Sequence, residues 1–134
     1  MSLEVVLDTN ILLLATDSKF NLSSEIERIV PQKHEIVVLS ACLDELELLS
    51  NRPNLARQIL FAKKLIETLN LVFYNPKDIK NTDDKIIQYA IENKDKCVVV
   101  TNDIGLRIIL REHNLPTIFV RYKKHLELEG VLPR

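Results

Sequence analysis

The chain alternates short apolar runs, rich in Val and Ile, with longer segments whose apolar residues recur at helical spacing. The short runs are mostly continuous, which is typical of strands that are covered on both faces in a parallel sheet. We predict five strands, at residues 4–7, 35–39, 71–74, 97–101 and 117–120. With helices between them, the fold class is α/β, a three-layer α/β/α sandwich around a central five-stranded, mostly parallel sheet.

Several of the helical segments carry start signals. Ser24 and Glu27 form a capping box in the segment SSEIERIVP, and Pro53 lies in the first turn of RPNLARQILFAKKLIETLN. Thr82 or Asp83 is expected to cap the segment TDDKIIQYAIEN. The segment IGLRIILREHN is expected to bury Leu106, Ile109 and Leu110.

The length and composition are those of one compact domain. A chain of 134 residues can bury a core without disulfides or structural metal, so we expect residues 1–134 to form a single domain. Cys42 and Cys97 lie far apart and have no closely spaced Cys or His partners. We therefore expect two buried thiols in a reducing compartment, and neither a zinc knuckle nor a redox pair.

The N-terminal residues MSLEVVLDTN lack the basic and apolar regions of a signal peptide, and no apolar run approaches the length of a bilayer span. We expect a soluble, cytoplasmic protein. The net charge of -1 gives no overall attraction to nucleic acid, so the distribution of charge matters more than its sum.

Acidic residues follow the predicted strands. Asp8 closes the first strand, Asp103 lies just past the fourth, Asp83 opens the helix after the third, and Glu45 lies in the helix SACLDELELLSN after the second. Strand ends and the helix starts that follow them share one edge of a parallel sheet, so these side chains should converge there.

Simpler interpretations exist for some of these acids. Capping and the helix dipole explain an Asp pair at a helix start, and this applies to Asp83 and Asp84. An exposed helix face normally carries acids, so position alone does not separate Glu45 from Asp44 and Glu47.

Carboxylates gathered at one sheet edge would repel one another, and a divalent cation removes this conflict. Mg²⁺ and Mn²⁺ prefer oxygen ligands and keep several waters, which suits a shallow acidic cluster. Such an ion lowers the pKa of a bound water and neutralises charge on a phosphate. The implied chemistry is hydrolysis of phosphodiester bonds.

Four segments, VVLDTNILL, VVLSACLDELELL, TDDKIIQYA and VVVTNDIGLRIIL, resemble the successive motifs of the PIN-domain family, which are metal-dependent nucleases with a central parallel sheet. The resemblance spans residues 5 to about 121. It implies that Asp8, Glu45, Asp83 and Asp103 are the catalytic residues and, with Asp84 as a further ligand, the metal site.

The same resemblance implies three supporting residues. Asn10 should brace the turn of the first motif, and Thr101 and Asn102 should orient the carboxylates by hydrogen bonding. Gly105 departs from the pattern, because some members carry another acid there, and this weakens the case for a stable second metal site.

Positive charge near the acidic site is needed to hold phosphates. The cluster Arg121, Lys123 and Lys124, with Tyr122 beside it for base stacking, is the predicted RNA-binding strip, although a solvated face is the default interpretation of such charges. Other candidates are scattered over the chain: Arg52, Arg57, Lys63, Lys64, Lys85 and Arg107.

We therefore expect a ribonuclease that uses Mg²⁺ or Mn²⁺ as its cofactor and RNA as its substrate. The ending PTIFVRYKKHLELEG resembles small stand-alone PIN proteins of archaea, a subgroup closer to ribosomal RNA processing nucleases than to toxins. Three alternatives stay open: a toxin ribonuclease with an antitoxin partner, a non-catalytic RNA-binding scaffold, and a phosphatase, although Asn10 stands where a phosphatase would carry a second Asp. The apolar surface of the helix from Pro53 could pair with a second copy, as a homodimer.

Overall fold

The computed structural model describes residues 2–17 and 19–134; Met1 and Ser18, within the predicted domain, lie outside the described residues. One sheet has the strand order β3-β2-β1-β4-β5-β6, and every neighbouring pair is parallel except β5 with β6. The strands are β1 (Leu3–Leu7), β2 (His34–Leu39), β3 (Asn70–Val72), β4 (Cys97–Val100), β5 (Thr117–Arg121) and β6 (His125–Glu129). The predicted mostly parallel α/β sheet is confirmed.

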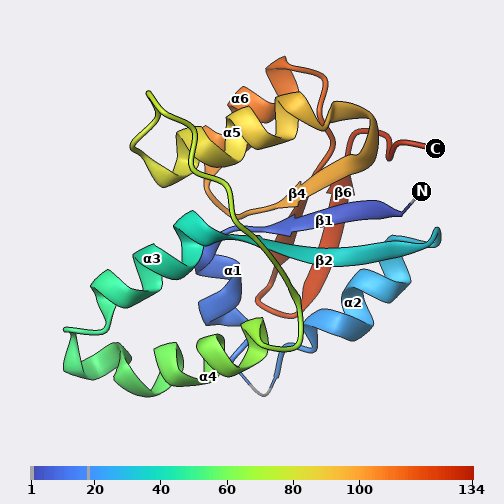
Figure 1. Ribbon diagram of the computed structural model, residues 1–134. Helices are drawn as coiled ribbons and strands as arrows, with labels where there is room; N and C mark the ends of the chain where they lie inside the picture. The colour runs from blue at the N-terminus through green and yellow to red at the C-terminus, as the bar shows by residue number, and fades with distance from the viewer. Residues whose placement is uncertain (1, 18) are drawn as a thin grey trace.

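Helices cover both faces of this sheet, which confirms the three-layer sandwich. They are α1 (Thr9–Leu14), α2 (Leu22–Ile29), α3 (Ser40–Leu49), α4 (Ala56–Ile66), α5 (Thr82–Glu92) and α6 (Ile104–Glu112), with 3-10 turns at η1 (Pro53–Leu55) and η2 (Lys94–Lys96). Figure 1 shows α5 and α6 above the sheet and α1, α2 and α4 below it, with α3 at the left edge, opposite the two termini. Among the described residues, no helix combines the length and apolar character that a membrane span needs.

The prediction of five strands is wrong, because β6 adds a sixth. Its sequence HLELE alternates polar and apolar residues, and only Leu126 is fully buried. An antiparallel edge strand has one face in solvent and reads as an alternating pattern, unlike the continuous runs of the buried parallel strands. Because of this difference in pattern, the continuous apolar runs did not predict β6.

Helix starts also differ from the predictions. The Asn21 side chain caps α2 by accepting a hydrogen bond from the Ser24 backbone N–H (3.0 Å), so the capping box at Ser24 is wrong. Asn81 caps α5 in the same way through Asp83 N–H (2.8 Å), in place of Thr82 or Asp83. In both cases Asn just ahead of the expected position provides the acceptor oxygen that helix N-termini require.

The core includes most of the apolar residues that recur at helical spacing along the chain. Ile59, Ala62 and Ile66 of α4 are buried, as are Leu106 and Leu110 of α6, whereas Ile109 is 40% exposed and its predicted burial is wrong. Cys42 and Cys97 are buried free thiols, and burial raises the pKa of each to about 12. They therefore pack as small apolar side chains, as predicted.

The register of the central strands decides which residues meet beyond their ends. Leu7, the last residue of β1, lies opposite Val38 of β2 and Val100 of β4. The segments that follow these strands consequently leave the sheet at the same edge, where open α/β folds bind ligands.

Candidate active site

Asp8 lies at the junction of β1 and α1. Its carboxylate accepts hydrogen bonds from the Thr9 backbone N–H (2.7 Å) and from the Thr101 hydroxyl (2.7 Å). The residue is only 4% exposed. Burial raises the pKa of Asp8, and the negative charges of Glu45 and Asp103 raise it further, against the two hydrogen bonds, which lower it. A buried carboxylate that faces other carboxylates is typical of a functional site.

Thr101 connects Asp8 with the segment after β4. Its side chain is fully buried, donates to Asp8 Oδ2 and accepts the Asp103 backbone N–H (3.1 Å). Asp103 in turn caps α6, because its Oδ1 accepts the Leu106 N–H (3.0 Å). One hydroxyl thus sets the positions of both acidic segments, which is the orienting contact that the sequence predicted for Thr101.

Asp83 reaches the same region from the first turn of α5. Partial burial and the negative charges of Asp8, Asp103 and Glu45 raise the pKa of Asp83 to about 6. The exposed Asp84 contributes the smallest of these repulsions and lies on the outer side of the turn. The structure therefore brings Asp8, Glu45, Asp83 and Asp103 together at one edge, with Asp84 at the margin.

The structure distinguishes the three acidic residues of α3 by their surroundings. Glu45 is half-buried and acts electrostatically on both Asp8 and Asp83. Glu47 is exposed and forms an ion pair with Lys63 of α4 (2.8 Å). Asp44 is also exposed, and it is not among the charges that raise the pKa of Asp8 or of Asp83. Side chains two residues apart on a helix face different directions, so only Glu45 turns toward the other acids.

Two supporting residues do not behave as expected. Asn10 is exposed in the first turn of α1, and its side chain makes no hydrogen bond with the residues that the structure describes, so it braces no turn. Asn102 does not touch a carboxylate, because its Oδ1 accepts the Val120 backbone N–H (2.7 Å) and fastens the loop to β5. Both predicted contacts are wrong, since helix α1 begins at once after β1 and Asn102 turns toward β5.

The predicted basic strip forms the turn between β5 and β6. Tyr122 and Lys123 both adopt positive φ (56° and 57°), and the Lys124 N–H donates to the Arg121 carbonyl (3.2 Å). The charge of Arg121 is engaged by Glu127 (2.9 Å). Lys123 and Lys124 are exposed, and they extend from the sheet edge at which β5 ends.

The donor chemistry of the site suits a divalent cation held through water. No three Asp, Glu, His or Cys side chains within residues 2–17 and 19–134 are arranged to hold a metal ion directly. Burial, and after it the negative charges of neighbouring carboxylates, nevertheless raise the pKa values of Asp8 and Asp83, so the site disfavours unneutralised negative charge. Mg²⁺ and Mn²⁺ typically bind through one or two carboxylates and several waters, which this open arrangement allows.

A side chain at Gly105 would crowd this cluster. A Cβ built there would lie 3.3 Å from Asp103 Oδ1, closer than most such contacts. The residue that departs from the family pattern thus leaves the Asp103 carboxylate room to cap α6.

The sequence did not reveal the arrangement of the segment after β3, because Phe73 and Tyr74 were expected within a strand at residues 71–74. Ser40 at the start of α3 and Tyr74 exchange two hydrogen bonds, and Phe73 beside them is exposed. The apolar pattern predicts a strand that ends at Tyr74, but it does not show which side chains of that strand face solvent.

A family model described as a PIN-like domain matches residues 5–123 of the chain. The chain belongs to the PIN-domain family. A curated relative, named Ribonuclease VapC4, from Methanocaldococcus jannaschii, is 37% identical to this PIN domain over 135 residues, with 96% of the chain and 98% of the relative covered.

A solved structure supports the fold of this PIN domain. It is titled the structure of the PIN domain endonuclease Utp24 and superposes with a TM-score of 0.77 at 24% identity, over 97% of this chain and 93% of that chain. At this level of identity the likeness concerns the fold alone.

Proposed function

We propose that this PIN domain is a divalent-metal-dependent endoribonuclease that hydrolyses RNA phosphodiester bonds. The observation that carries the proposal is the convergence of Asp8, Glu45, Asp83 and Asp103 from four separate segments at one sheet edge, where burial and the neighbouring negative charges raise the pKa values of Asp8 and Asp83. The relative from Methanocaldococcus jannaschii, named a ribonuclease, supports RNA as the substrate.

The four carboxylates and, at the margin, Asp84 would hold Mg²⁺ or Mn²⁺, mostly through bound waters. When bound, the ion supplies a water of lowered pKa and neutralises charge on the phosphate. The protein's own contribution is to position the ligands. Thr101 holds Asp8 in one orientation, and the α6 N-terminus holds Asp103.

RNA would approach an acidic site that by itself repels phosphate, so neighbouring cations must contribute to binding. Arg121, Lys123 and Lys124 are the proposed contacts at the β5–β6 turn, although the ion pair with Glu127 leaves Arg121 less of its charge to offer. Tyr122 is exposed beside them.

A purified-protein assay tests the proposal. Unstructured RNA should be cut in Mn²⁺ and left intact in EDTA, and Asp8→Asn should lose nearly all activity. If the wild-type protein binds Mn²⁺ but cuts neither RNA nor DNA, the non-catalytic scaffold is the better interpretation.

Ribosomal RNA processing is the biological role that we propose, and a toxin with an antitoxin partner is the alternative. Induced expression in a bacterial host separates them. Growth arrest that Asp8→Asn relieves would favour the toxin, whereas specific cleavage of ribosomal precursor RNA without arrest would favour processing.

A homodimer through α4 is a separate proposal. Leu60 and Phe61 of this helix are about half exposed, which leaves apolar surface for a second copy. Sedimentation of wild type and of Leu60→Glu would show whether a dimer forms through this surface.

A further inference from the structure

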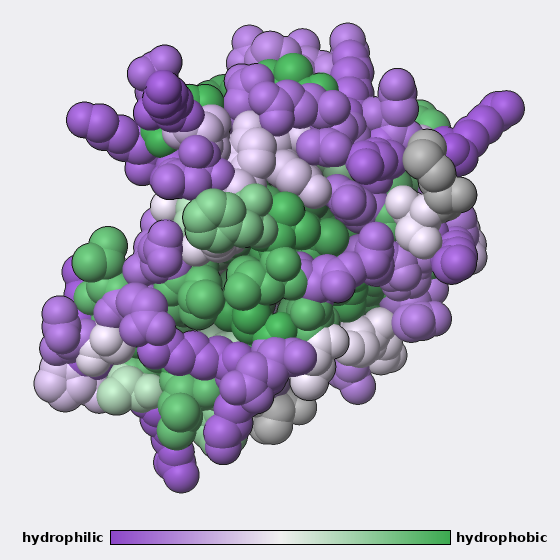
Figure 2. Space-filling model, viewed as in Figure 1, coloured by the Kyte–Doolittle hydropathy of each residue, from purple (hydrophilic) through white to green (hydrophobic). Residues whose placement is uncertain are grey.

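Phe73 exposes an aromatic ring at the edge of the sheet where the acids gather. It is 85% exposed and directly follows β3, whose carboxyl end lies at the same edge as the ends of β1, β2 and β4. Figure 2, which views the molecule from the β3 side of the sheet, shows apolar surface across the middle, between polar surfaces above and below it. A single exposed Phe is ordinary, but Phe73 differs in the contacts that hold its backbone and in the charges that surround it.

The backbone beside Phe73 is fastened to the start of α3. The Tyr74 N–H donates to Ser40 Oγ (3.0 Å), and the Ser40 hydroxyl donates to the Tyr74 carbonyl oxygen (3.3 Å). These contacts continue the pairing of β2 with β3 past its last register pair, Leu39 with Val72. The segment that carries Phe73 is therefore attached to the helix that carries Glu45.

The Tyr74 side chain fixes the direction of its neighbour. Its ring packs edge-on against Tyr89 of α5 (centroids 5.1 Å apart), and its hydroxyl donates to Glu92 (2.9 Å). Burial alternates from Leu71 to Pro76, as in an extended chain, whose successive side chains point to opposite sides. Because Tyr74 is held inward, Phe73 is directed outward and loses little further backbone freedom when a ligand contacts it.

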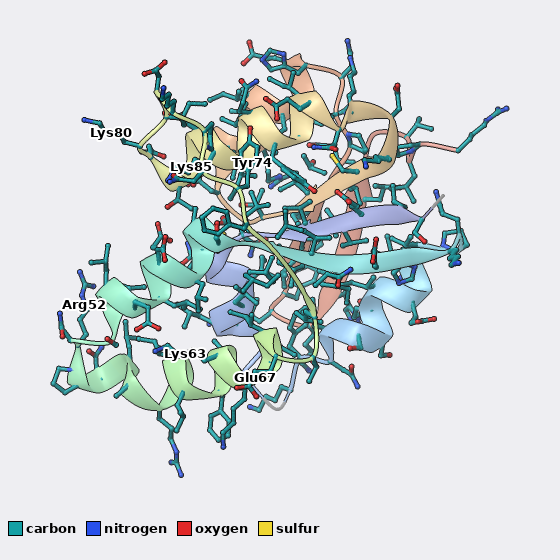
Figure 3. The ribbon with its side chains drawn as sticks, in the orientation of Figure 1. Arg52, Lys63, Glu67, Tyr74, Lys80 and Lys85 are labelled. Carbon is teal, nitrogen blue, oxygen red and sulfur yellow. The ribbon has the colours of Figure 1, made fainter. Side chains whose placement is uncertain are left out.

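Cations lie on both sides of the segment that carries Phe73. Lys85 of α5 donates to the Asn75 side chain (3.2 Å), two residues beyond Phe73. Figure 3 shows Lys80 and Lys85 on the α5 side and Arg52 and Lys63 on the opposite side, with Tyr74 between α5 and the sheet. Lys63 forms an ion pair with Glu47. Lys80, Lys85 and Arg52 form no ion pair with the residues that the structure describes, so their charges can contact phosphates.

We propose that Phe73 is a stacking platform for one base of a single-stranded RNA whose backbone passes Lys80 and Lys85 on its way to the acidic site. The inference rests on the proposed ribonuclease function and adds a named base contact to it. Exposed aromatic rings beside cations are the usual means by which proteins bind single strands without reading their sequence. Leu71 is also exposed, but the neighbouring lysines favour a polyanion over an apolar protein partner.

Binding is measured by the anisotropy of a labelled, unstructured oligoribonucleotide, in the Asp8→Asn background so that no strand is cut. Phe73→Ala should weaken binding about tenfold. Phe73→Trp should restore it, and Phe73→Leu, which is apolar but not flat, should not. Val131→Ala, at an apolar side chain that is also 85% exposed, is the matched control and should bind as the parent does. An abasic strand of equal length should bind the parent and Phe73→Ala equally.

The outcomes separate this inference from the proposed function. Cleavage of RNA by the wild-type protein in Mn²⁺ reports on the function alone. If Phe73→Ala binds the oligoribonucleotide as tightly as its parent, or if Phe73→Leu equals Phe73→Trp, base stacking is overturned while the ribonuclease stands. A loss of dimer mass on sedimentation of Phe73→Ala, with RNA binding unchanged, would instead assign the ring to a contact between copies.

Discussion

The Thr101 hydroxyl donates a 2.7 Å hydrogen bond to Asp8 Oδ2, although the two residues are 93 positions apart in the sequence. Both side chains are buried, so the bond is shielded from water. A hydrogen bond to a buried carboxylate is stronger than a neutral one, and it counteracts the rise in pKa that burial causes. This pair joins the first and fourth motifs into one site.

Removal of the Thr101 hydroxyl should destabilise the fold and impair the site together. Thr101→Val leaves Asp8 with one fewer donor and should lower the free energy of unfolding in EDTA by about 2 kcal/mol, measured by urea denaturation. Thr101→Ser keeps the hydroxyl and should retain most of the stability and activity. Equal stability of Val and Ser variants would contradict this role.

Asp83 should make the metal-free protein less stable as the pH rises. Its pKa is raised to about 6 in the folded state from 3.8, so the folded protein binds more protons than the unfolded chain between these values. The stability contributed by the protonated carboxyl is therefore lost between about pH 4 and 6. Asp83→Asn should flatten this part of the pH profile in EDTA, and Asp95→Asn should not.

Mn²⁺ should raise the melting temperature measurably, because an ion that binds only the folded protein stabilises it. Asp8→Asn should abolish most of that rise, since the amide carries no negative charge toward the ion. The measurement is a thermal melt with and without Mn²⁺. An undiminished shift in Asp8→Asn would remove Asp8 from the proposed metal site.

Glu45 and Glu47 offer a matched test on one helix. Glu45→Gln should lower Mn²⁺-dependent kcat by at least about tenfold, because it faces Asp8 and Asp83. Glu47→Gln loses only a surface pair with Lys63 and should change stability by less than about 1 kcal/mol and leave kcat unchanged. Similar losses in both variants would place the site elsewhere on α3.

Glu25 of α2 should stabilise the attachment of the edge strand at neutral pH and lose this effect in acid. It accepts hydrogen bonds from Arg28 (2.9 Å) and from the Leu126 N–H of β6 (2.7 Å), and the contact with Arg28 is the main reason that its pKa is lowered to about 2. A lowered pKa stabilises the fold above about pH 4.5, and this contribution is lost as the pH falls toward 2.

Glu25→Gln should therefore reduce stability at pH 7 by about 1 kcal/mol and weaken the pH dependence between 4.5 and 2. The exposed Glu27, on the same helix, is the control. Acid titrations followed by circular dichroism compare the two variants, and identical curves would refute the role of Glu25.

Some of the site could be read from local pattern alone. Asp8 directly follows a continuous apolar run, and Asp103 comes two polar residues after CVVV. A carboxylate just past the end of a buried parallel strand lies at the ligand-binding edge. The sequence also predicts helix α4, because its apolar residues recur at helical spacing. The strand β6 was not, because an edge strand buries too few side chains to leave a continuous apolar signal.

The sequence by itself determined the order of the elements and the approximate positions of the acids, since apolar periodicity and strand ends are local properties. Only the tertiary structure decided between Glu45 and Glu47, turned Asn102 toward β5 and exposed Phe73 beside a fastened Tyr74. The physical reason is that the direction of a side chain depends on which distant segment packs against its helix or strand. The local spacing of residues does not identify that segment.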